Sequence, residues 1–124
     1  MRVQFDSFFA ITGRWHLTQT EKRALLGSPS DERWHEFVHG DVTKITPEEF
    51  ARLHALGEID SALSLLVNDP RDVARWFRTL EMSPPFFGRT PLAMLFRGMQ
   101  GFKSVADYLA ARRPASGVRI AVRQ

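Results

Sequence analysis

The chain has 124 residues, of which 44% are hydrophobic and 25% are charged, and it contains no cysteine. This length suits one domain or two small helical subdomains that share a core, and the lack of cysteine excludes disulfides and thiolate metal sites. No apolar run approaches the roughly 20 residues that cross a bilayer, and the first residues lack the apolar stretch of a secretion signal. We therefore expect a cytoplasmic protein with no membrane partner.

The net charge of +3 is distributed unevenly along the chain. Up to Val67 there are seven cations against ten acids, which gives −3, and after Val67 there are ten cations against four acids, which gives +6. An acidic partner surface is therefore expected to meet the second half of the chain.

The first 45 residues carry the signals of three short helices. Aromatic side chains at i, i+3 and i+4 in residues 5–12 predict a first helix that ends at Gly13. Thr18 and Glu21 have the spacing of a capping box, so a second helix is expected to run to Gly27.

A third helix is predicted from Ser28 or Ser30 to Gly40, with Trp34 and Phe37 on its apolar face. Two short helices around a glycine turn are typical of a helix-turn-helix, which we assign to residues 1–45.

Residues 46–67 form the longest regular pattern. Thr46 and Glu49 make a second capping box, and Pro47 occupies the first helical position. Gly57 lies inside this helix, where glycine is unfavourable, so we expect a close helix crossing there. The face expected to be buried consists of Phe50, Leu53, Leu56, Ile59, Leu63 and Leu66.

The pattern of residues 68–113 predicts a compact helical region with one non-helical interruption. A helix begins at Asp69-Pro70 and is expected to use Leu80 as its last apolar contact. Helical periodicity returns in residues 92–99 and again in residues 102–109.

The interruption is the stretch 83–92. Pro84, Pro85 and Gly88 disfavour a continuous helix, and Thr90 with Pro91 has the pattern of an N-cap followed by the first helical residue. Two adjacent phenylalanines stand between the stop and the restart. Each ring is expected either in the core of its own domain or against a partner.

The tail, residues 114–124, has a different period. Val118, Ile120 and Val122 alternate with Arg119, Ala121 and Arg123, which suits an extended segment with one apolar and one basic face. A disordered end is the alternative.

One motif points to enzymatic chemistry. His35-Glu36-Phe37-Val38-His39 matches HExxH, in which two histidines one helical turn apart bind zinc and the glutamate is a general base. A catalytic zinc also needs a third protein ligand. In the alternative reading, Phe37 and Val38 face the core and the histidines are partly solvated.

Binding of DNA by the second and third helices would need cations for the phosphates. The third helix carries Asp31, Glu32 and Glu36, which repel phosphate. The alternative is therefore that the helix-turn-helix has a structural role and does not bind DNA. The candidate DNA-binding residues are Lys22, Arg23, Arg33 and His35.

Several short segments follow one another in a specific order between residues 8 and 113. They are Trp15-x-Leu17, Glu21, Leu25-Leu26-Gly27, Trp34, the leucine-rich helix, Arg75-Trp76, Phe87-Gly88-Arg89-Thr90-Pro91-Leu92 and Val105-x-x-Tyr108-Leu109. In this order they resemble the Xre/MbcA/ParS antitoxin family. The most specific segment is residues 87–92, which is similar to the glycine-arginine-small-proline-leucine signature of that family's toxin-binding domain.

The resemblance implies an all-α antitoxin with an Xre-like helix-turn-helix region, residues 1–45, a connecting helix, residues 46–67, and a toxin-binding region, residues 68–113. The usual partner is a RES-domain toxin that consumes NAD. Family members also regulate their own operon, often as dimers or in complex with the toxin, although their recognition helix is usually more basic than residues 30–35.

Inhibition by binding is the function we expect from these features together, with no cofactor and no catalysis. The alternatives are a helix-turn-helix repressor without a toxin and a small zinc hydrolase that uses His35, Glu36 and His39. The candidate toxin-binding residues are Phe86, Phe87, Arg89, Arg112, Arg113 and Arg119.

Overall fold

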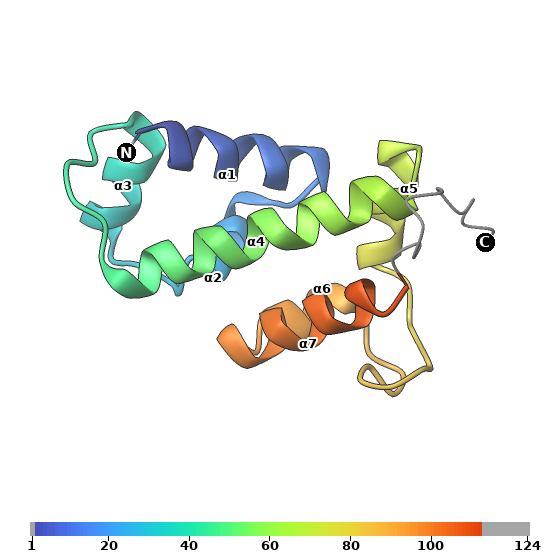
Figure 1. Ribbon diagram of the computed structural model, residues 1–124. Coiled ribbons are helices and arrows are strands. Elements are labelled where there is room, and N and C mark those ends of the chain that lie inside the picture. The colour runs from blue at the N-terminus through green and yellow to red at the C-terminus, as the bar shows by residue number, and fades with distance from the viewer. Residues whose placement is uncertain (1, 113–124) are drawn as a thin grey trace.

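The computed structural model describes residues 2–112, with side chains from Ser7 onward, and these residues are helical apart from connections and one isolated bridge (Figure 1). The predicted all-α class is confirmed over this range. Arg113 and the tail, which contains Arg119, lie outside it. The helices are α1 (Arg2–Arg14), α2 (Gln19–Leu25), α3 (Asp31–His39), α4 (Pro47–Leu66), α5 (Pro70–Phe77), α6 (Pro91–Leu95) and α7 (Met99–Ala110).

The predicted helix starts are confirmed by side-chain caps. Thr18 and Thr46 each accept a hydrogen bond from the backbone N–H three residues on, and the glutamate at that position accepts one in return from the cap residue. Ser30 and Thr90 accept the corresponding bond at the starts of α3 and α6. Each cap satisfies a backbone donor that the first helical turn leaves free.

Helix α4 runs through the middle of the molecule, with α1 on one side and α7 on the other (Figure 1). Its buried residues are Leu56, Ile59, Ala62, Leu63 and Leu66. They belong to one cluster with side chains from Phe8 in α1 to Leu109 in α7. The expected regions therefore share a single core, and α2 and α3 pack at one end of it.

Arg52 of α4 connects distant parts of the chain. Its guanidinium lies 5.7 Å from the centre of the Phe102 ring in α7 and donates to the carbonyl oxygen of Leu25 at 3.2 Å. Gly27, with φ of 90°, lets the backbone pass next to the same guanidinium. A single cation thus links α2, α4 and α7.

The structure departs from the predicted helical periodicity at three positions. Phe50 was expected in the core but lies in the first turn of α4 and is 49% exposed. Helix α5 ends at Phe77, so Leu80 lies beyond it and is 65% exposed. Met99 begins α7 rather than ending α6, since Gly98, with φ of 92°, separates the two helices.

The close helix crossing lies at Gly101 and not at Gly57. A Cβ atom at Gly57 would meet nothing within 4 Å, whereas one at Gly101 would lie 1.8 Å from the carbonyl oxygen of Met94. The expectation for Gly57 was wrong. Helix α7 can approach α6 this closely only because residue 101 has no side chain.

Gly101→Ala is therefore expected to lower the free energy of unfolding by at least about 1–3 kcal/mol, since the backbone of α6 or α7 must move. Gly57→Ala is the matched control and is expected to raise it by up to about 1 kcal/mol, because alanine favours a helix interior. Urea denaturation of both variants measures the two effects. Equal effects would contradict the assigned crossing.

Candidate functional site

Residues 80–89, which we name the aromatic loop, connect α5 to α6 and project from one end of the molecule (Figure 1). The N–H of Glu81 donates to the carbonyl oxygen of Arg89 at 3.0 Å, and the N–H of Gly88 donates to that of Glu81 at 2.8 Å. Inside this closure, the N–H groups of Phe86 and Phe87 both donate to the carbonyl oxygen of Ser83. The loop is thus closed by its own backbone.

Phe86 anchors the loop in the core. Its ring is fully buried and makes edge-to-face contacts with Trp76 of α5, at 6.2 Å between ring centres, and with Tyr108 of α7, at 4.8 Å. Phe86 was predicted as a partner contact, but its burial leaves it no surface to offer. Its role is to fix the loop to both helices.

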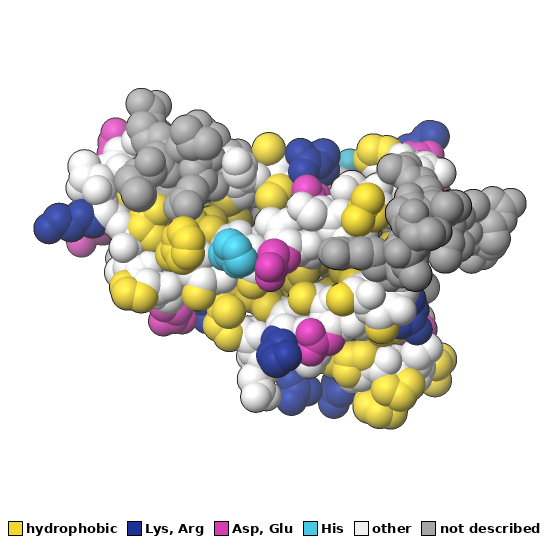
Figure 2. Space-filling model, in the orientation of Figure 1, with side chains coloured by type: hydrophobic (Ala, Val, Ile, Leu, Met, Phe, Trp, Pro, Cys, Tyr) yellow, Lys and Arg dark blue, Asp and Glu magenta, His cyan; other side chains and the backbone are white. Residues whose placement is uncertain are grey.

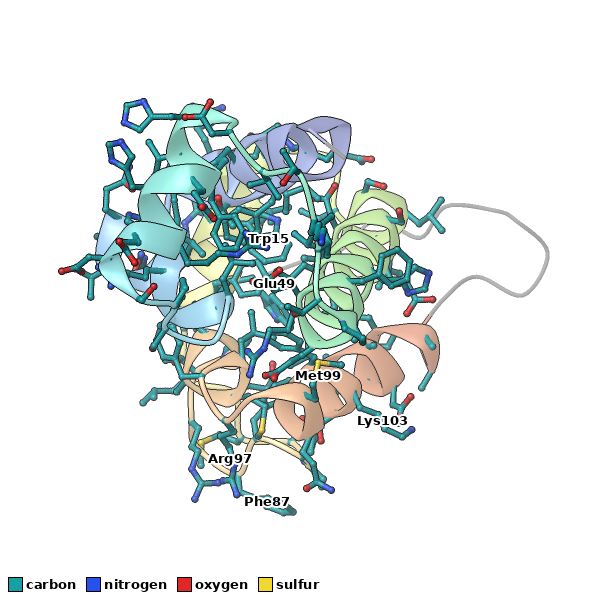
Figure 3. All side chains as sticks on the ribbon, turned by 90° about the vertical axis from the view of Figure 1, so that its left-hand side faces the viewer. Trp15, Glu49, Phe87, Arg97, Met99 and Lys103 are labelled. Carbon is teal, nitrogen blue, oxygen red and sulfur yellow. The ribbon has the colours of Figure 1, made fainter. Side chains whose placement is uncertain are left out.

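Phe87 has the opposite environment. Its side chain is 68% exposed and is directed away from the molecule (Figure 3). Met82 and Leu80 are 73% and 65% exposed, so the loop presents three large apolar side chains to solvent. In Figure 2 hydrophobic side chains gather at the lower right, where Figure 1 places this loop. An exposed apolar cluster of this kind is typical of a binding surface.

The backbone of Phe87 is strained. Its φ of 49° is in the left-handed region, which costs a bulky residue of order 1–3 kcal/mol. Gly88, with φ of 92°, follows at no such cost. Strain of this kind persists only where the surroundings impose it, and here the anchored Phe86 and the Ser83 hydrogen bonds impose it.

The cations near the loop have no acidic partner. Arg89 and Arg97 are exposed and form no ion pair with any residue that the structure describes. Arg112, at the end of α7, stacks on the Tyr108 ring at 3.6 Å and donates to the carbonyl oxygen of Tyr108. Among the described residues of the second half, the cations without an ion pair therefore lie around the aromatic loop and the last turn of α7.

Arg23 and Arg33 of the first half are held by the protein itself. Arg33 donates to the Glu49 carboxylate at 2.6 and 2.9 Å, to Glu36 at 2.7 Å and to the carbonyl oxygen of Lys44 at 2.6 Å. Arg23 donates to the carbonyl oxygen of Pro29 and to the Asp31 carboxylate. Of the DNA-binding candidates, these two are committed to internal contacts.

The other two DNA-binding candidates have weaker ties. Lys22 lies 5.9 Å from the centre of the Phe9 ring, and His35 is exposed on α3. The sequence alone did not indicate the internal partners of Arg23 and Arg33, because Glu49 and the two carbonyl groups approach them only in the folded chain.

The HExxH residues do not assemble a zinc site in the described range. His35 and His39 lie together, with 4.0 Å between ring centres, but Glu36 is paired with Arg33. His54, a possible third ligand, lies on α4 next to Glu58. Within residues 2–112, no group of three His, Asp or Glu side chains is placed to bind a metal ion.

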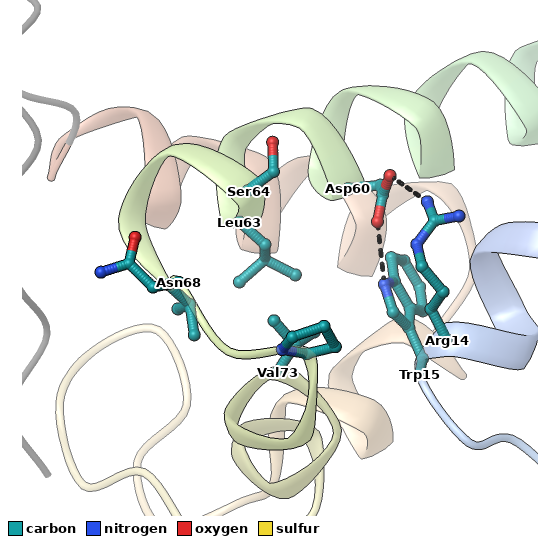
Figure 4. Close-up of a pocket in the computed structure, with 9 residues that line it drawn as sticks. Arg14, Trp15, Asp60, Leu63, Ser64, Asn68 and Val73 are labelled. Carbon is teal, nitrogen blue, oxygen red and sulfur yellow. Dashed lines mark hydrogen bonds and ion pairs between the residues drawn. The ribbon is translucent and has the colours of Figure 1, made fainter.

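A hollow of about 450 Å³ lies where the end of α1 meets α4 and α5 (Figure 4). Asp60 there accepts hydrogen bonds from the indole N–H of Trp15 at 3.2 Å and from Arg14 at 2.7 Å. The two charged groups of its lining are thus paired with each other, and its walls are largely apolar. This arrangement supports packing rather than acid–base chemistry.

Comparisons with protein-family models, with curated proteins and with solved structures find no match to this chain. Among residues 2–112, no helix has both the length and the apolar character needed to cross a membrane.

Three members of the site were not predicted. Leu80 was assigned to the core, and Met82 and Arg97 carried no distinguishing pattern. Met82 stands directly before the proline-rich stop, and a large apolar residue at such a position is the one signal that could have indicated it.

The pKa of Glu49 provides a test of its ion pair with Arg33. Partial burial raises this pKa, but hydrogen bonds from Arg33 and Thr46 outweigh the effect and lower it below the ordinary value. The folded state therefore gains stability above the ordinary glutamate pKa, near 4.3, and loses it as the pH falls further.

Glu49→Gln retains the capping geometry and removes the charge, so we expect a loss of about 1–2 kcal/mol in the free energy of unfolding at pH 7. Below pH 4 the difference from the unmodified chain is expected to shrink. Denaturation at a series of pH values measures this. Glu32→Gln is the control, because Glu32 forms no ion pair with a described residue. A constant difference at all pH values would contradict the assignment.

Proposed function

We propose that this protein is an antitoxin that neutralises a toxin by direct binding through the aromatic loop. The main observation in support is the difference in burial between two adjacent rings, since Phe86 is fully buried and Phe87 is 68% exposed. A loop that needed phenylalanine only for folding would not hold a second ring in solvent. The sequence resemblance to antitoxins is strongest in residues 87–92, which begin at this exposed ring.

The physical basis of binding would be burial of a preorganised apolar cluster. Full burial of one large apolar side chain contributes roughly 1.5–3 kcal/mol, and Phe87, Met82 and Leu80 are all available for it. Because the loop is fixed by Phe86 and its own backbone hydrogen bonds, little conformational entropy remains to be lost on binding.

Arg89 and Arg97 favour an acidic partner surface. Neither has an internal carboxylate, so each is free to form charge-assisted hydrogen bonds with carboxylates of the toxin. A RES-domain toxin that consumes NAD is the partner implied by the resemblance. In this proposal the protein is not an enzyme, and it acts in the cytoplasm as a homodimer or in a hetero-oligomer with the toxin.

Regulation of its own operon is a weaker part of the proposal. The α2–α3 pair has the helix lengths of a helix-turn-helix, with residues 26–30 between the helices. The engagement of Arg23 and Arg33 leaves Lys22 and His35 as the candidate contacts to DNA. We therefore propose that α2 and α3 serve mainly to build the fold, and that DNA binding is their secondary role.

Phe87→Ala is expected to weaken toxin binding by more than about tenfold and to leave the free energy of unfolding nearly unchanged, because the ring is exposed and alanine retains the Cβ atom at the same left-handed backbone position. Phe86→Ala is expected to lower the free energy of unfolding by about 3–5 kcal/mol. Calorimetric titration with the cognate toxin, together with urea denaturation, measures both quantities.

Phe50→Ala is the matched control, since Phe50 is similarly exposed but lies on α4 at the other end of the core (Figure 1). It is expected to bind toxin like the unmodified chain. If Phe87→Ala also neutralised the toxin fully in co-expression, the aromatic loop would not be the toxin-binding site.

Binding of DNA is tested separately by fluorescence anisotropy with the sequence upstream of the gene. We expect at most weak binding that disappears as salt rises from about 50 to 200 mM, as for a small number of phosphate contacts. Tight binding that Lys22→Ala or His35→Ala removes would restore the repressor alternative.

A further inference from the structure

A second hollow, of about 460 Å³, lies between the last turns of α4, the outer side of α5 and the end of α7. We name it the α5–α7 groove. Its apolar lining includes Leu66, Val67, Trp76, Tyr108 and Leu109. Its volume is in the range of sites that bind a ligand or a short peptide segment.

The two aromatic rings of the groove are arranged to receive an apolar or cationic chain. Trp76 and Tyr108 are both half-buried and lie nearly parallel, with 6.2 Å between ring centres and 23° between planes. Rings in this position offer apolar area and a face that attracts cations. Arg112 already uses the Tyr108 ring in this manner, at 3.6 Å.

The charges of the groove leave one carboxylate without a cation. Asp72 is paired with Arg75, whereas Glu81 forms no ion pair with a described residue. Glu81 accepts hydrogen bonds from the N–H and hydroxyl of Ser83, at 3.4 and 3.0 Å, and its carboxylate also interacts with the hydroxyl of Tyr108, but none of these partners carries a positive charge. Its negative charge is thus available to a basic ligand.

We propose that the α5–α7 groove binds the chain's own C-terminal segment, residues 118–123. The last described residue, Arg112, itself lines the groove, and twelve residues follow it. Five residues lie between Arg112 and Val118, and the six Cα-to-Cα steps span up to about 20 Å when extended, so the segment can reach the groove. Pro114 and Gly117 provide the residues at which a chain reverses direction.

The chemistry of this segment matches the groove. Val118, Ile120 and Val122 form one apolar edge in an extended chain and would contact the apolar lining. Arg119 and Arg123 form the other edge, and one of them would pair with Glu81. Because Glu81 also belongs to the aromatic loop, the bound segment lies directly beside the proposed toxin-binding surface. The inference stands whether or not the partner is a toxin.

A nitroxide spin label on Ala121→Cys tests this in the full chain, which has no other cysteine. Ala121 lies on the basic edge of the segment, so the label leaves the apolar edge intact. We expect the NMR signal of the Trp76 indole N–H to be lost through paramagnetic broadening. The Trp34 indole on α3, at the far end of the molecule, is expected to keep its signal.

The control combines the same label with Val118→Ser and Ile120→Ser. It retains the tether and removes the apolar edge, so recovery of the Trp76 signal is expected. Glu81→Gln is expected to give partial recovery. Equal broadening with and without the serines, or a Trp76 signal that the label never affects, would overturn the proposal.

A mixture of isotope-labelled chain without nitroxide and unlabelled chain with nitroxide separates the two possible sources of the segment. Loss of the Trp76 signal in this mixture would mean that the segment comes from a second copy, and would also overturn binding within one chain. An unchanged Trp76 signal in the mixture is the expected result.

Discussion

The rest of the structure depends on the buried face of α4. This helix is the only described element with α1 on one side and α7 on the other, and its buried residues between Leu56 and Leu66 belong to the core cluster that includes side chains of both neighbours. Arg52 adds a polar connection, since its guanidinium touches the Phe102 ring and the carbonyl of Leu25. The position of the aromatic loop therefore follows from α4, because Phe86 packs between helices that are themselves placed against it.

The charge asymmetry of the sequence becomes an asymmetry of free charges in the fold. In the first half, Arg14, Arg23 and Arg33 all find carboxylates. Arg78 of the second half crosses to Glu21, whose pKa its hydrogen bonds lower, and so ties α5 to the capping box of α2. The described arginines without an ion pair, Arg89, Arg97 and Arg112, all lie around the aromatic loop and the end of α7, while Lys22 and Lys44 of the first half also form no ion pair with a described residue.

Local interactions were predictable from sequence and non-local ones were not. The caps at Thr18, Thr46 and Thr90 depend on atoms three residues apart, so their patterns were sufficient. Whether a helix needs glycine at a given position depends on which atoms lie next to it in the folded chain. For this reason the close helix crossing was predicted at Gly57, whereas the structure has it at Gly101. In the candidate site, the sequence showed that two rings interrupt the helices. It could not decide which ring is buried, because adjacent loop residues have no periodicity to distinguish them.

The left-handed backbone of Phe87 bears on how this position tolerates change. Asparagine or glycine would adopt its φ of 49° with less strain and would expose less apolar surface. Selection for folding alone would therefore replace this residue, and so would consensus design or laboratory evolution guided by thermal stability. Retention of phenylalanine under such conditions would reveal a requirement outside the folded chain itself. At this position, a substitution that makes the fold more stable is therefore expected to weaken binding of the partner.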